Sequence, residues 1–241
     1  MKEHQFIKTI KEVLDSKYIG DDCAYLKDLG IVISQDNLVE GIHFVNADAY
    51  KLGYKSAMVN ISDIAASGAK PKYLTVGLSL PKNIDVDFIK KFYKGMKDAC
   101  QDIEIVGGDI TASDRIMISV AIIGNTKGRK ISSRKNAKIG YKIVTSGYHG
   151  SSAAGLIGIL NGQKNEFIEN HLMPKAKLEF SKNIAENIKT DYAMMDTSDG
   201  IADALIQISE ASGVLMDIKN IPYDENLEKF DNFKDLILYG R

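Results

Sequence analysis

The sequence predicts an α/β protein in which helices cover one face of a mixed sheet. Residues 73–80 and 116–122 alternate between large apolar residues and small or polar ones. Alternation with period two is typical of strands that have one strongly apolar face. Between these segments, apolar residues at helical spacing run over 88–100, and a short apolar run follows at 103–106. A strand, a helix and two further strands indicate a layered α/β or α+β arrangement.

Three more elements are expected before these strands. Apolar residues at helical spacing over 6–14 predict an amphipathic opening helix. The β-branched run at 31–34 is typical of a short strand. Residues 57–68 predict a helix. Gly68 suits a left-handed C-cap at its end, and Pro71 prevents the helix from continuing.

Residues 125–138 are expected to separate two domains. This segment has six basic residues and almost no apolar ones, and domain boundaries fall in polar linkers. We therefore expect an N-terminal domain at 1–134 and a C-terminal α+β domain at 135–241. The second domain is predicted to have strands at 143–144 and 192–195 and helices at 152–160, 175–188 and 201–211.

Composition excludes several classes of function. The 241 residues include 31 basic and 32 acidic ones, so no basic excess indicates a nucleic-acid partner. Two cysteines in unrelated contexts form neither a disulfide framework nor a zinc cluster. No run approaches the roughly 18 apolar residues of a membrane span, and the N-terminus is too polar for a signal peptide. We expect a cytoplasmic protein without a membrane partner.

The common nucleotide and hydrolase motifs are absent, and aspartates recur beside apolar elements instead. A single aspartate of this kind is most often a turn former or a helix N-cap. If the chain brings several together, their oxygen ligands would select Mg²⁺ or Mn²⁺, and Mg²⁺ is often shared with substrate phosphates. The pattern therefore indicates phosphate chemistry. These aspartates are Asp21, Asp22, Asp36, Asp63, Asp109, Asp196 and Asp199.

Two glycine-rich segments could support that chemistry, and each has a simpler reading. Gly107 and Gly108 are expected in a turn after the strand at 103–106, either bringing backbone close to a phosphate or only forming a tight turn. Residues 150–156 are expected to begin a helix whose free N–H groups hold an anion, or one that is capped by serine and closely packed.

Six short sequences together resemble the thiamine-monophosphate kinase family, within the aminoimidazole ribonucleotide synthetase superfamily. They occur in the family's order, and the LVEGIHF sequence at 38–44 distinguishes this family from its relatives. The other matching sequences are GDDCA at 20–24, SQDN at 34–37, VNISDIAASGA at 59–69, GGDIT at 107–111 and DTSDGI at 196–201.

The resemblance implies transfer of the ATP γ-phosphoryl group to thiamine phosphate, with several Mg²⁺ ions. Among these residues, Asp63, Asp109 and Asp199 are expected to be catalytic. His43 falls where the family contacts thiamine phosphate; without the resemblance, it would be taken as a buried structural histidine. ATP-binding positions are Gly108, Asp109, Arg134 and Ser198. Metal-binding positions are Asp22, Ser34, Gln35, Asp36, Asp63, Asp109, Asp196 and Asp199.

The resemblance also implies a homodimer joined through the N-terminal sheets, with a C-terminal α+β domain beside each. The alternating strands point the same way, because they carry more apolar face than a small domain needs to bury. Arg134 is expected to offer its planar guanidinium to a phosphate, or else to be a solvated linker residue.

Three departures from the family pattern are visible. Gln35 replaces a common threonine, and Ser151 replaces the aspartate that usually begins the following helix. The sequence ends at Arg241, before the family's GGEDYEL-like strand, so the C-terminal domain is incomplete relative to the family. Two alternatives stay open: an ATP-dependent synthetase acting on another phosphorylated metabolite, or a non-catalytic nucleotide-binding protein.

Overall fold

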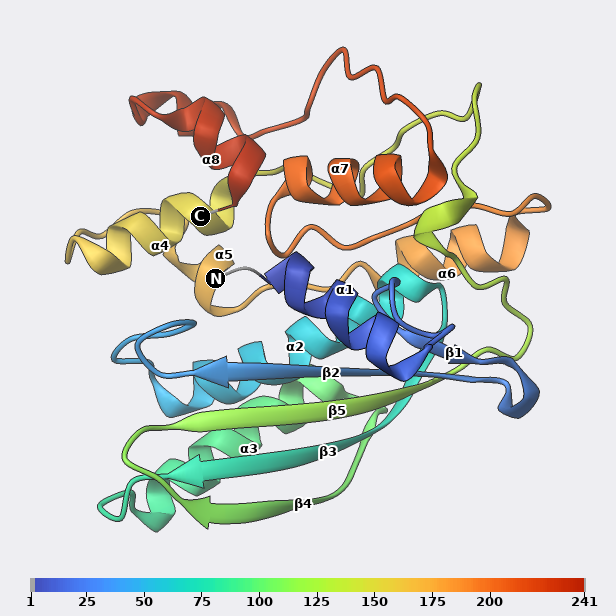
Figure 1. Ribbon diagram of the computed structural model, residues 1–241. Helices are drawn as coiled ribbons and strands as arrows, with labels where there is room; N and C mark the ends of the chain where they lie inside the picture. Colours follow the sequence, from blue (N-terminus) through green and yellow to red (C-terminus); the bar gives the residue numbers. More distant parts are fainter. Residues whose placement is uncertain (1–2, 241) are drawn as a thin grey trace.

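A mixed five-stranded sheet organises the N-terminal half of the molecule. The computed structural model describes residues 3–240, except for the His4 side chain, and the strand order is β1-β2-β5-β3-β4 (Figure 1). The strands are β1 (Ala24–Leu26), β2 (Ile31–Val39), β3 (Lys70–Leu80), β4 (Glu104–Ala112) and β5 (Met117–Asn125). The main helices are α1 (Glu3–Leu14), α2 (Ala49–Ser67), α3 (Val86–Cys100), α4 (Ser151–Leu160), α5 (Ile168–Leu172), α6 (Leu178–Asn187), α7 (Ile201–Ser212) and α8 (Phe233–Tyr239).

One pair of strands is parallel and the rest are antiparallel. β3 and β4 run parallel, and α3 provides the crossover that such a pair requires. β1 with β2, β2 with β5, and β5 with β3 are antiparallel. The α/β class and the mixed sheet predicted from the sequence are confirmed.

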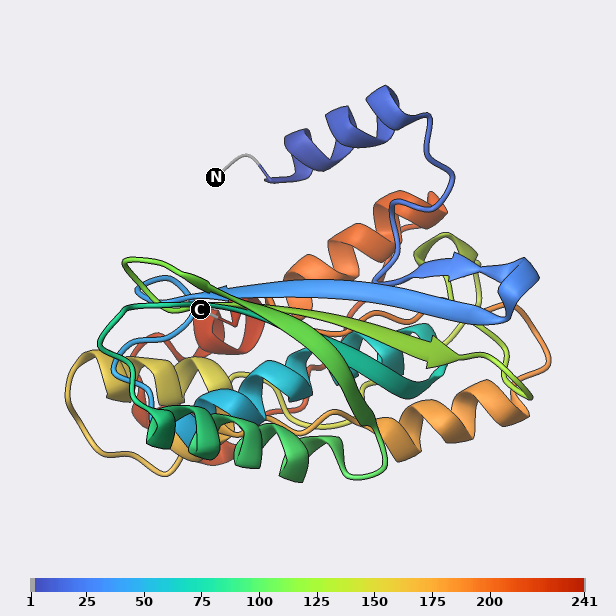
Figure 2. The same ribbon diagram turned by 90° about the horizontal axis from the view of Figure 1, so that it is seen from below.

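Two helices, α2 and α3, cover one face of the sheet (Figure 2). The alternating apolar residues of β3 and β5, including Val76 and Val120, point into this layer and are fully buried. The other face of the sheet has no such cover, and α1 lies away from it on that side (Figure 2). The expectation that the apolar face needs a second chain to bury it is therefore wrong, because this chain's own helices bury it.

Close packing of α2 against α3 depends on two glycines. A Cβ atom on Gly53 would lie 1.9 Å from the carbonyl oxygen of Phe92, and one on Gly95 would lie 1.9 Å from that of Tyr50. The two helix backbones therefore touch directly. This contact fixes the distance of α3 from α2, and α2 carries part of the candidate site.

Several element boundaries differ from the expected ones. α2 begins at Ala49, where Asp48 caps it by accepting a hydrogen bond from the Lys51 amide. β2 continues to Val39, so Asp36 lies inside the strand and not after it. Pairing with β5 extends β2, and the Asp48 cap sets the start of α2. Both effects outweigh the local residue preferences on which the expected boundaries were based.

Gly107, Gly108 and Asp109 lie within β4 and not in a turn after it. The β3–β4 register shifts near Thr75, and Val106 is the extra residue of a bulge. A Cβ on Gly108 would lie 1.9 Å from the Val76 carbonyl oxygen. Close approach of the two strands is thus sufficient to explain glycine at this position.

The C-terminal half is helical in the described residues. A second apolar core forms among α4, α5, α8 and the 3₁₀ turn Glu225–Lys229, and it includes Phe167, Leu227 and Leu236. The strands expected at 143–144 and 192–195 do not form, because neither segment has a ladder partner among residues 3–240. The helices expected near α4, α6 and α7 are present.

The connecting segment at 125–138 joins the two halves closely. The Lys130 amide donates to the Ala185 carbonyl on α6, and the Ser181 hydroxyl donates to the Ala65 carbonyl on α2. α6 therefore packs on the N-terminal half, although it follows the expected boundary. Within the described residues, no helix is long and apolar enough to cross a membrane.

Substitution Gly95→Ala is expected to destabilise the protein, although alanine normally favours a helix interior. Overpacking of this kind costs about 1–3 kcal/mol, which corresponds to roughly 2–4 °C in melting temperature per kcal/mol for a chain of this size. Gly107→Ala is the matched control, because no atom lies within 4 Å of a Cβ built there. Equal melting temperatures for the two variants would contradict the close contact.

Candidate functional site

Three aspartates from distant parts of the chain meet in one place. Asp22 lies just before β1, Asp63 lies on α2, and Asp196 lies before α7. One carboxylate oxygen from each residue lies within 4.8 Å of the other two. We call these three residues the carboxylate cluster.

Hydroxyl groups and one arginine hold the carboxylate cluster in place. The Ser34 hydroxyl on β2 donates to the Asp63 carboxylate at 2.7 Å. The Ser62 hydroxyl, from the residue before Asp63 on α2, donates to the Asp196 carboxylate at 3.0 Å. Sheet, helix and C-terminal half each contribute a contact, so the cluster depends on the packing of all three.

Arg134 provides the positive charge next to the cluster. Its Nη2 donates to Asp22 at 2.6 Å, and its Nη1 donates to the Gln207 side chain on α7. The Arg134 side chain is 15% exposed and that of Asp22 is 6% exposed. The Nε of Arg134 is buried and has no hydrogen-bond partner among the residues that the structure describes. Arg134 is therefore not a solvated linker residue.

Asp21 fixes the segment that presents this arginine. Its carboxylate accepts hydrogen bonds from the Arg134 amide at 2.7 Å and from the Ser133 hydroxyl at 2.8 Å. The two adjacent aspartates thus have different partners: Asp21 binds the backbone of the connecting segment, and Asp22 binds its guanidinium.

Burial and repulsion oppose ionisation of the cluster. Burial, with the charge of Asp196 next in importance, raises the pKa of Asp22 to about 7, although Arg134 acts in the opposite direction. Burial, with the charges of Asp196 and Asp36, raises the pKa of Asp63 to about 9. The pKa of Asp196 is also raised, mainly by burial. Like charges in a poorly solvated place favour the neutral acid.

Asp36 and Asp199 extend the acidic region. Burial first, and then the charges of Asp196 and Asp199, raise the pKa of Asp36. Asp36 lies on the α2-facing side of β2, since its partner across the ladder is the buried Val120. Asp199 is exposed at the start of the segment leading into α7.

Asp109 does not join this group. It pairs in register with Gly77, which aligns across β5 with Ser119 and Asn37 on the uncovered face of the sheet. Asp36 faces the opposite side and lies on a strand three positions away, at about 4.8 Å per strand. Asp36 and Asp109 therefore do not face each other within this chain.

The other expected site residues are placed as follows. The Gln35 side chain lies on the uncovered face and donates to the Ser119 hydroxyl at 3.2 Å. His43 is exposed, so the buried structural reading is wrong, and its Nδ1 accepts from the Val39 amide at 3.0 Å. The charge of His43 acts on Asp36, which places it near the acidic region. Ser198 is exposed and contacts Asp196 at 3.5 Å.

Sequence reasoning missed three supporting residues. Asn60 accepts a hydrogen bond from the Asp36 amide, Ser62 donates to Asp196, and Gln207 receives the Arg134 guanidinium. Asn60 lies three residues before Asp63 on α2, so the two side chains lie on the same side of the helix, and this spacing was a usable signal. Gln207 carried no signal, because its role depends on how α7 docks.

The donor set of the cluster fits a hard divalent cation. Carboxylate and hydroxyl oxygens are the ligands that Mg²⁺ prefers, and no histidine or thiol enters the group of three. Burial and neighbouring negative charges raise the pKa values of these carboxyls. A cation bound between them would favour their ionised forms.

Comparison with known proteins identifies the family. The profile described as AIR synthase related protein, N-terminal domain, matches residues 20–126, which span the whole sheet. The thiamine-monophosphate kinase of Aquifex aeolicus (strain VF5) is 34% identical over 95% of this chain and 77% of that protein. The chain belongs to the thiamine-monophosphate kinase family.

Other members of the thiamine-monophosphate kinase family agree. That of Escherichia coli (strain K12) is 32% identical over 88% of this chain and 68% of that protein. The solved structure described as AaThiL complexed with AMPPCP and TMP is 33% identical and covers 99% of this chain and 81% of that chain, with a TM-score of 0.92. The family resemblance seen in the sequence motifs is therefore confirmed.

Without metal, the stability of the protein is expected to fall as the pH rises. The folded chain holds the Asp63 proton more tightly than the unfolded chain, which adds to the free energy of unfolding. This stabilisation is complete below the ordinary pKa of 3.8 and is lost as the pH rises toward 9. Asp63→Asn keeps an acceptor for Ser34 and removes the ionising group. In EDTA, its melting temperature should lie closest to that of the wild type near pH 4 and exceed it most at pH 9.

The control for this measurement is Asp109→Asn, which removes an exposed carboxylate outside the cluster. Its melting curve should follow the wild type at both pH values. Parallel pH profiles for wild type and Asp63→Asn would show that Asp63 is not the group opposed by burial and repulsion.

Proposed function

We propose that this protein transfers the γ-phosphoryl group of ATP to thiamine phosphate, giving thiamine diphosphate and ADP. The observation that carries the proposal is the carboxylate cluster, three partly buried acids with oxygens within 4.8 Å of one another, with Arg134 paired to Asp22. Family membership supports the substrates, since a relative of high structural similarity was solved with AMPPCP, an ATP analogue, and TMP.

The chemistry requires positioning more than a strong base. The acceptor is a phosphate oxygen, already anionic near neutral pH, so no group needs to remove a proton from an alcohol. The difficulty is to align two polyanions for in-line transfer, which is a matter of orientation and of compensating charge. We expect the protein's contribution to be the rigid placement of oxygen ligands around the reacting phosphates.

Six residues are proposed to hold several Mg²⁺ ions. Bound Mg²⁺ neutralises phosphate charge and orients the reacting groups. Asp63 lies at the centre of the proposed set, because the charges of Asp36, Asp22 and Asp196 all act on it. The set is Asp22, Ser34, Asp36, Asp63, Asp196 and Asp199. Asp63 and Asp199 remain the proposed catalytic aspartates of this chain, as direct neighbours of the reacting phosphates.

The Arg134 guanidinium is proposed to exchange its ion-pair partner, from the Asp22 carboxylate to a phosphate of ATP. It now neutralises Asp22, and its buried Nε is still able to donate. When a cation takes over Asp22, the planar guanidinium becomes available to an ATP phosphate, for which it has the matching geometry. Ser198, next to Asp196, is proposed to contact the same nucleotide.

His43 is proposed to contact the acceptor. It is exposed, it lies near Asp36, and its ring is held by the Val39 amide in the turn after β2. This position places it beside the acidic region without making it part of the carboxylate cluster. An imidazole there can bind the phosphate of thiamine phosphate at the edge of the metal site.

We also propose that the protein is a homodimer through the uncovered face of the sheet. Tyr73 is 42% exposed and Met117 is 41% exposed on this face. Asp109 and Gln35, which face away from the carboxylate cluster of their own chain, would then lie at the junction of the two sheets. The proposed metal-binding role of Asp109 and Gln35 therefore depends on the second chain. The proposed ATP-binding role of Gly108 and Asp109 depends on it as well.

The activity is tested by incubating the protein with ATP, Mg²⁺ and thiamine phosphate and measuring ADP and thiamine diphosphate. The expected result is equal amounts of both products, loss of turnover in EDTA, and a loss of orders of magnitude in Asp63→Asn. His43→Ala should raise the KM for thiamine phosphate and leave that for ATP within about twofold.

Two outcomes would overturn the proposal or parts of it. Turnover with another phosphorylated metabolite and none with thiamine phosphate would favour the synthetase alternative. ATP binding without any turnover would favour a non-catalytic nucleotide-binding protein. Equal effects of His43→Ala on both KM values would remove His43 from the acceptor end.

The dimer is tested by sedimentation of the wild type and of Ala121→Glu at micromolar concentration. Ala121 lies on the central strand β5, on the uncovered face between Gln35 and Thr75. A buried charge at that place should convert the dimer to a monomer. Lys90→Glu on α3 is the control and should sediment as the wild type; a monomeric wild type would contradict the proposal.

A further inference from the structure

The backbone of Arg134 is fixed from both halves of the molecule. The Asp21 carboxylate accepts a hydrogen bond from the Arg134 amide at 2.7 Å. The Ser212 hydroxyl, at the end of α7, donates to the Arg134 carbonyl at 2.6 Å and accepts from the Ala137 amide at 3.0 Å. The short turn that begins at Arg134 is thus tied to α7, and the arginine side chain starts from a fixed position.

Two of the three guanidinium nitrogens of Arg134 have partners, and these partners differ in charge. Nη2 donates to the Asp22 carboxylate at 2.6 Å, and Nη1 donates to the side-chain oxygen of Gln207 on α7. Nε is buried and has no hydrogen-bond partner among the described residues. Nε and Nη2 lie along one edge of the planar group, with Nη1 on the other side. The N–H groups of such an edge form the fork that binds a phosphate through two parallel hydrogen bonds.

The exchange of partners proposed for Arg134 opens this fork and leaves one contact in place. When Asp22 binds a cation, Nη2 loses its partner, and the whole Nε–Nη2 edge becomes available to a phosphate. Gln207 is then the remaining partner of the guanidinium among the residues that the structure describes. Its contact is with Nη1, so it does not compete with the phosphate for the donors of the fork.

A neutral acceptor suits this place better than a charged or an apolar one. A carboxylate at position 207 would form an ion pair with the guanidinium and would compete with the phosphate for its charge. An apolar side chain would leave Nη1 without its hydrogen bond in half-buried surroundings, which costs stability. The amide oxygen of Gln207 accepts from Nη1 and leaves the positive charge of Arg134 available.

Asp203 determines which way the Gln207 amide faces. The Gln207 Nε2 donates to the Asp203 carboxylate. The two residues are four positions apart on α7, so their side chains are neighbours on one side of the helix. An ionised carboxylate only accepts hydrogen bonds. The amide nitrogen therefore faces Asp203, and the amide oxygen faces Arg134.

We propose that Gln207 is a positioning residue for the nucleotide: it keeps the Nε–Nη2 edge of Arg134 directed at a phosphate, and Asp203 orients Gln207. The inference rests on the proposed kinase function, which identifies the phosphate as one of ATP. It adds α7 to the elements that determine nucleotide affinity, although Gln207 and Asp203 act through Arg134 and not by touching the nucleotide.

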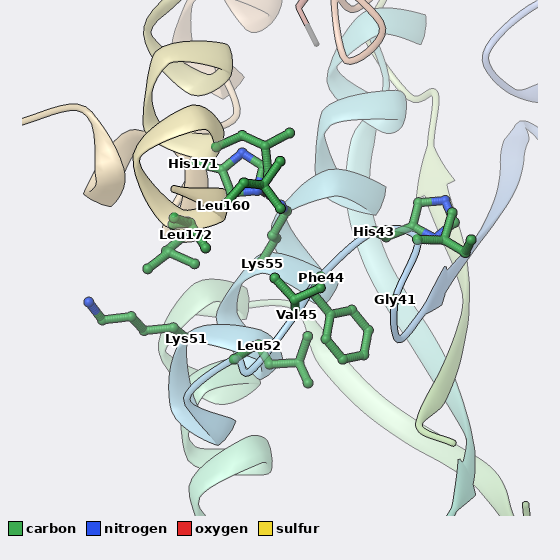
Figure 3. Close-up of a pocket in the computed structure, with 14 residues that line it drawn as sticks. Gly41, His43, Phe44, Val45, Lys51, Leu52, Lys55, Leu160, His171 and Leu172 are labelled. Atoms are coloured by element: carbon green, nitrogen blue, oxygen red, sulfur yellow. Dashed lines mark hydrogen bonds between the residues drawn. The ribbon is translucent and has the colours of Figure 1, made fainter. Parts of the chain in front are cut away.

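The acceptor end of the site provides an internal reference for testing this role. His43 lines a cavity of about 250 Å³ that is formed by the 41–47 loop, α2, α4 and α5 (Figure 3). Neither Arg134 nor Gln207 lines this cavity. An effect that passes through Arg134 should therefore change nucleotide binding and leave the use of thiamine phosphate unchanged.

The test measures the affinity for AMPPCP with Mg²⁺ by calorimetry, together with both KM values of the kinase assay. Gln207→Leu removes the acceptor at similar volume, and Gln207→Glu keeps an acceptor and adds a charge. Each should weaken AMPPCP binding and raise the KM for ATP at least fivefold, with the KM for thiamine phosphate within about twofold of the wild type. Gln163→Leu, at an exposed glutamine that follows α4, is the matched control and should bind AMPPCP within about twofold of the wild type.

Two substitutions of Asp203 test its part in the arrangement. Asp203→Asn keeps an acceptor for the Gln207 amide and should bind AMPPCP within about twofold of the wild type. Asp203→Leu removes that acceptor and should weaken AMPPCP binding at least threefold. If melting shows that Gln207→Leu does not fold, Gln207→Glu and Asp203→Leu decide.

A double variant shows whether Gln207 acts through the arginine. Arg134→Met removes the guanidinium, and in this background Gln207→Leu should cause no further loss of AMPPCP affinity. Additive losses would overturn the inference. So would single variants of Gln207 that melt at a lower temperature and bind AMPPCP as the wild type does, because the contact would then be structural only.

Failure of this inference and failure of the proposed function are separate outcomes. A wild type that binds AMPPCP but makes no thiamine diphosphate would overturn the kinase proposal, and the binding data would still decide the role of Gln207. A wild type that makes thiamine diphosphate, with Gln207 variants that bind AMPPCP equally well, would overturn only this inference. A wild type that does not bind AMPPCP would overturn both.

Discussion

The mutual repulsion of buried carboxylates is the constraint on which this structure depends. Asp22, Asp63 and Asp196 are brought together in a place that raises the pKa values of all three, with only Arg134 to offset their charge. Here α2, packed between the sheet and a second, helical half, holds these groups together through hydrogen bonds from Ser34, Ser62 and Arg134.

α2 connects these layers. Its C-terminal part carries Ser62 and Asp63 toward the acidic region. Its N-terminal part packs directly on the backbone of α3, because Gly53 leaves no side chain between the two helices. The same helix therefore contributes to the core and to the candidate site.

Much of the fold could be predicted from the sequence because its signals are local. Period-two alternation in β3 and β5 and helical spacing in α3 are properties of short segments, and they predicted the correct elements. The expected strands at 143–144 and 192–195 failed for the complementary reason. A strand exists only with a neighbour, and short apolar runs do not show whether one is present.

The candidate site was partly predictable for similar reasons. Aspartates beside apolar elements, and the family motifs, identified Asp22, Asp63 and Asp196. The face of the sheet on which each side chain lies was harder to predict from the sequence. Asp36 and Asp109 both lie in strands, and only the register and a bulge in β4 show that they face opposite sides. The role of Gln207 depends on the docking of α7, which no local pattern reports.

The order in which the cluster's members occur along the chain has a consequence for folding. Asp22 and Asp63 belong to the first part of the chain, whereas Asp196 follows after most of it has been synthesised. Contacts between such distant positions form slowly, because a long loop must close first. On the ribosome, the sheet with α2 and α3 can therefore fold while only two of the three acids are present. The repulsion that characterises the finished site is incomplete at this early stage, and its largest contribution arises only when α7 docks and brings Asp196 with it.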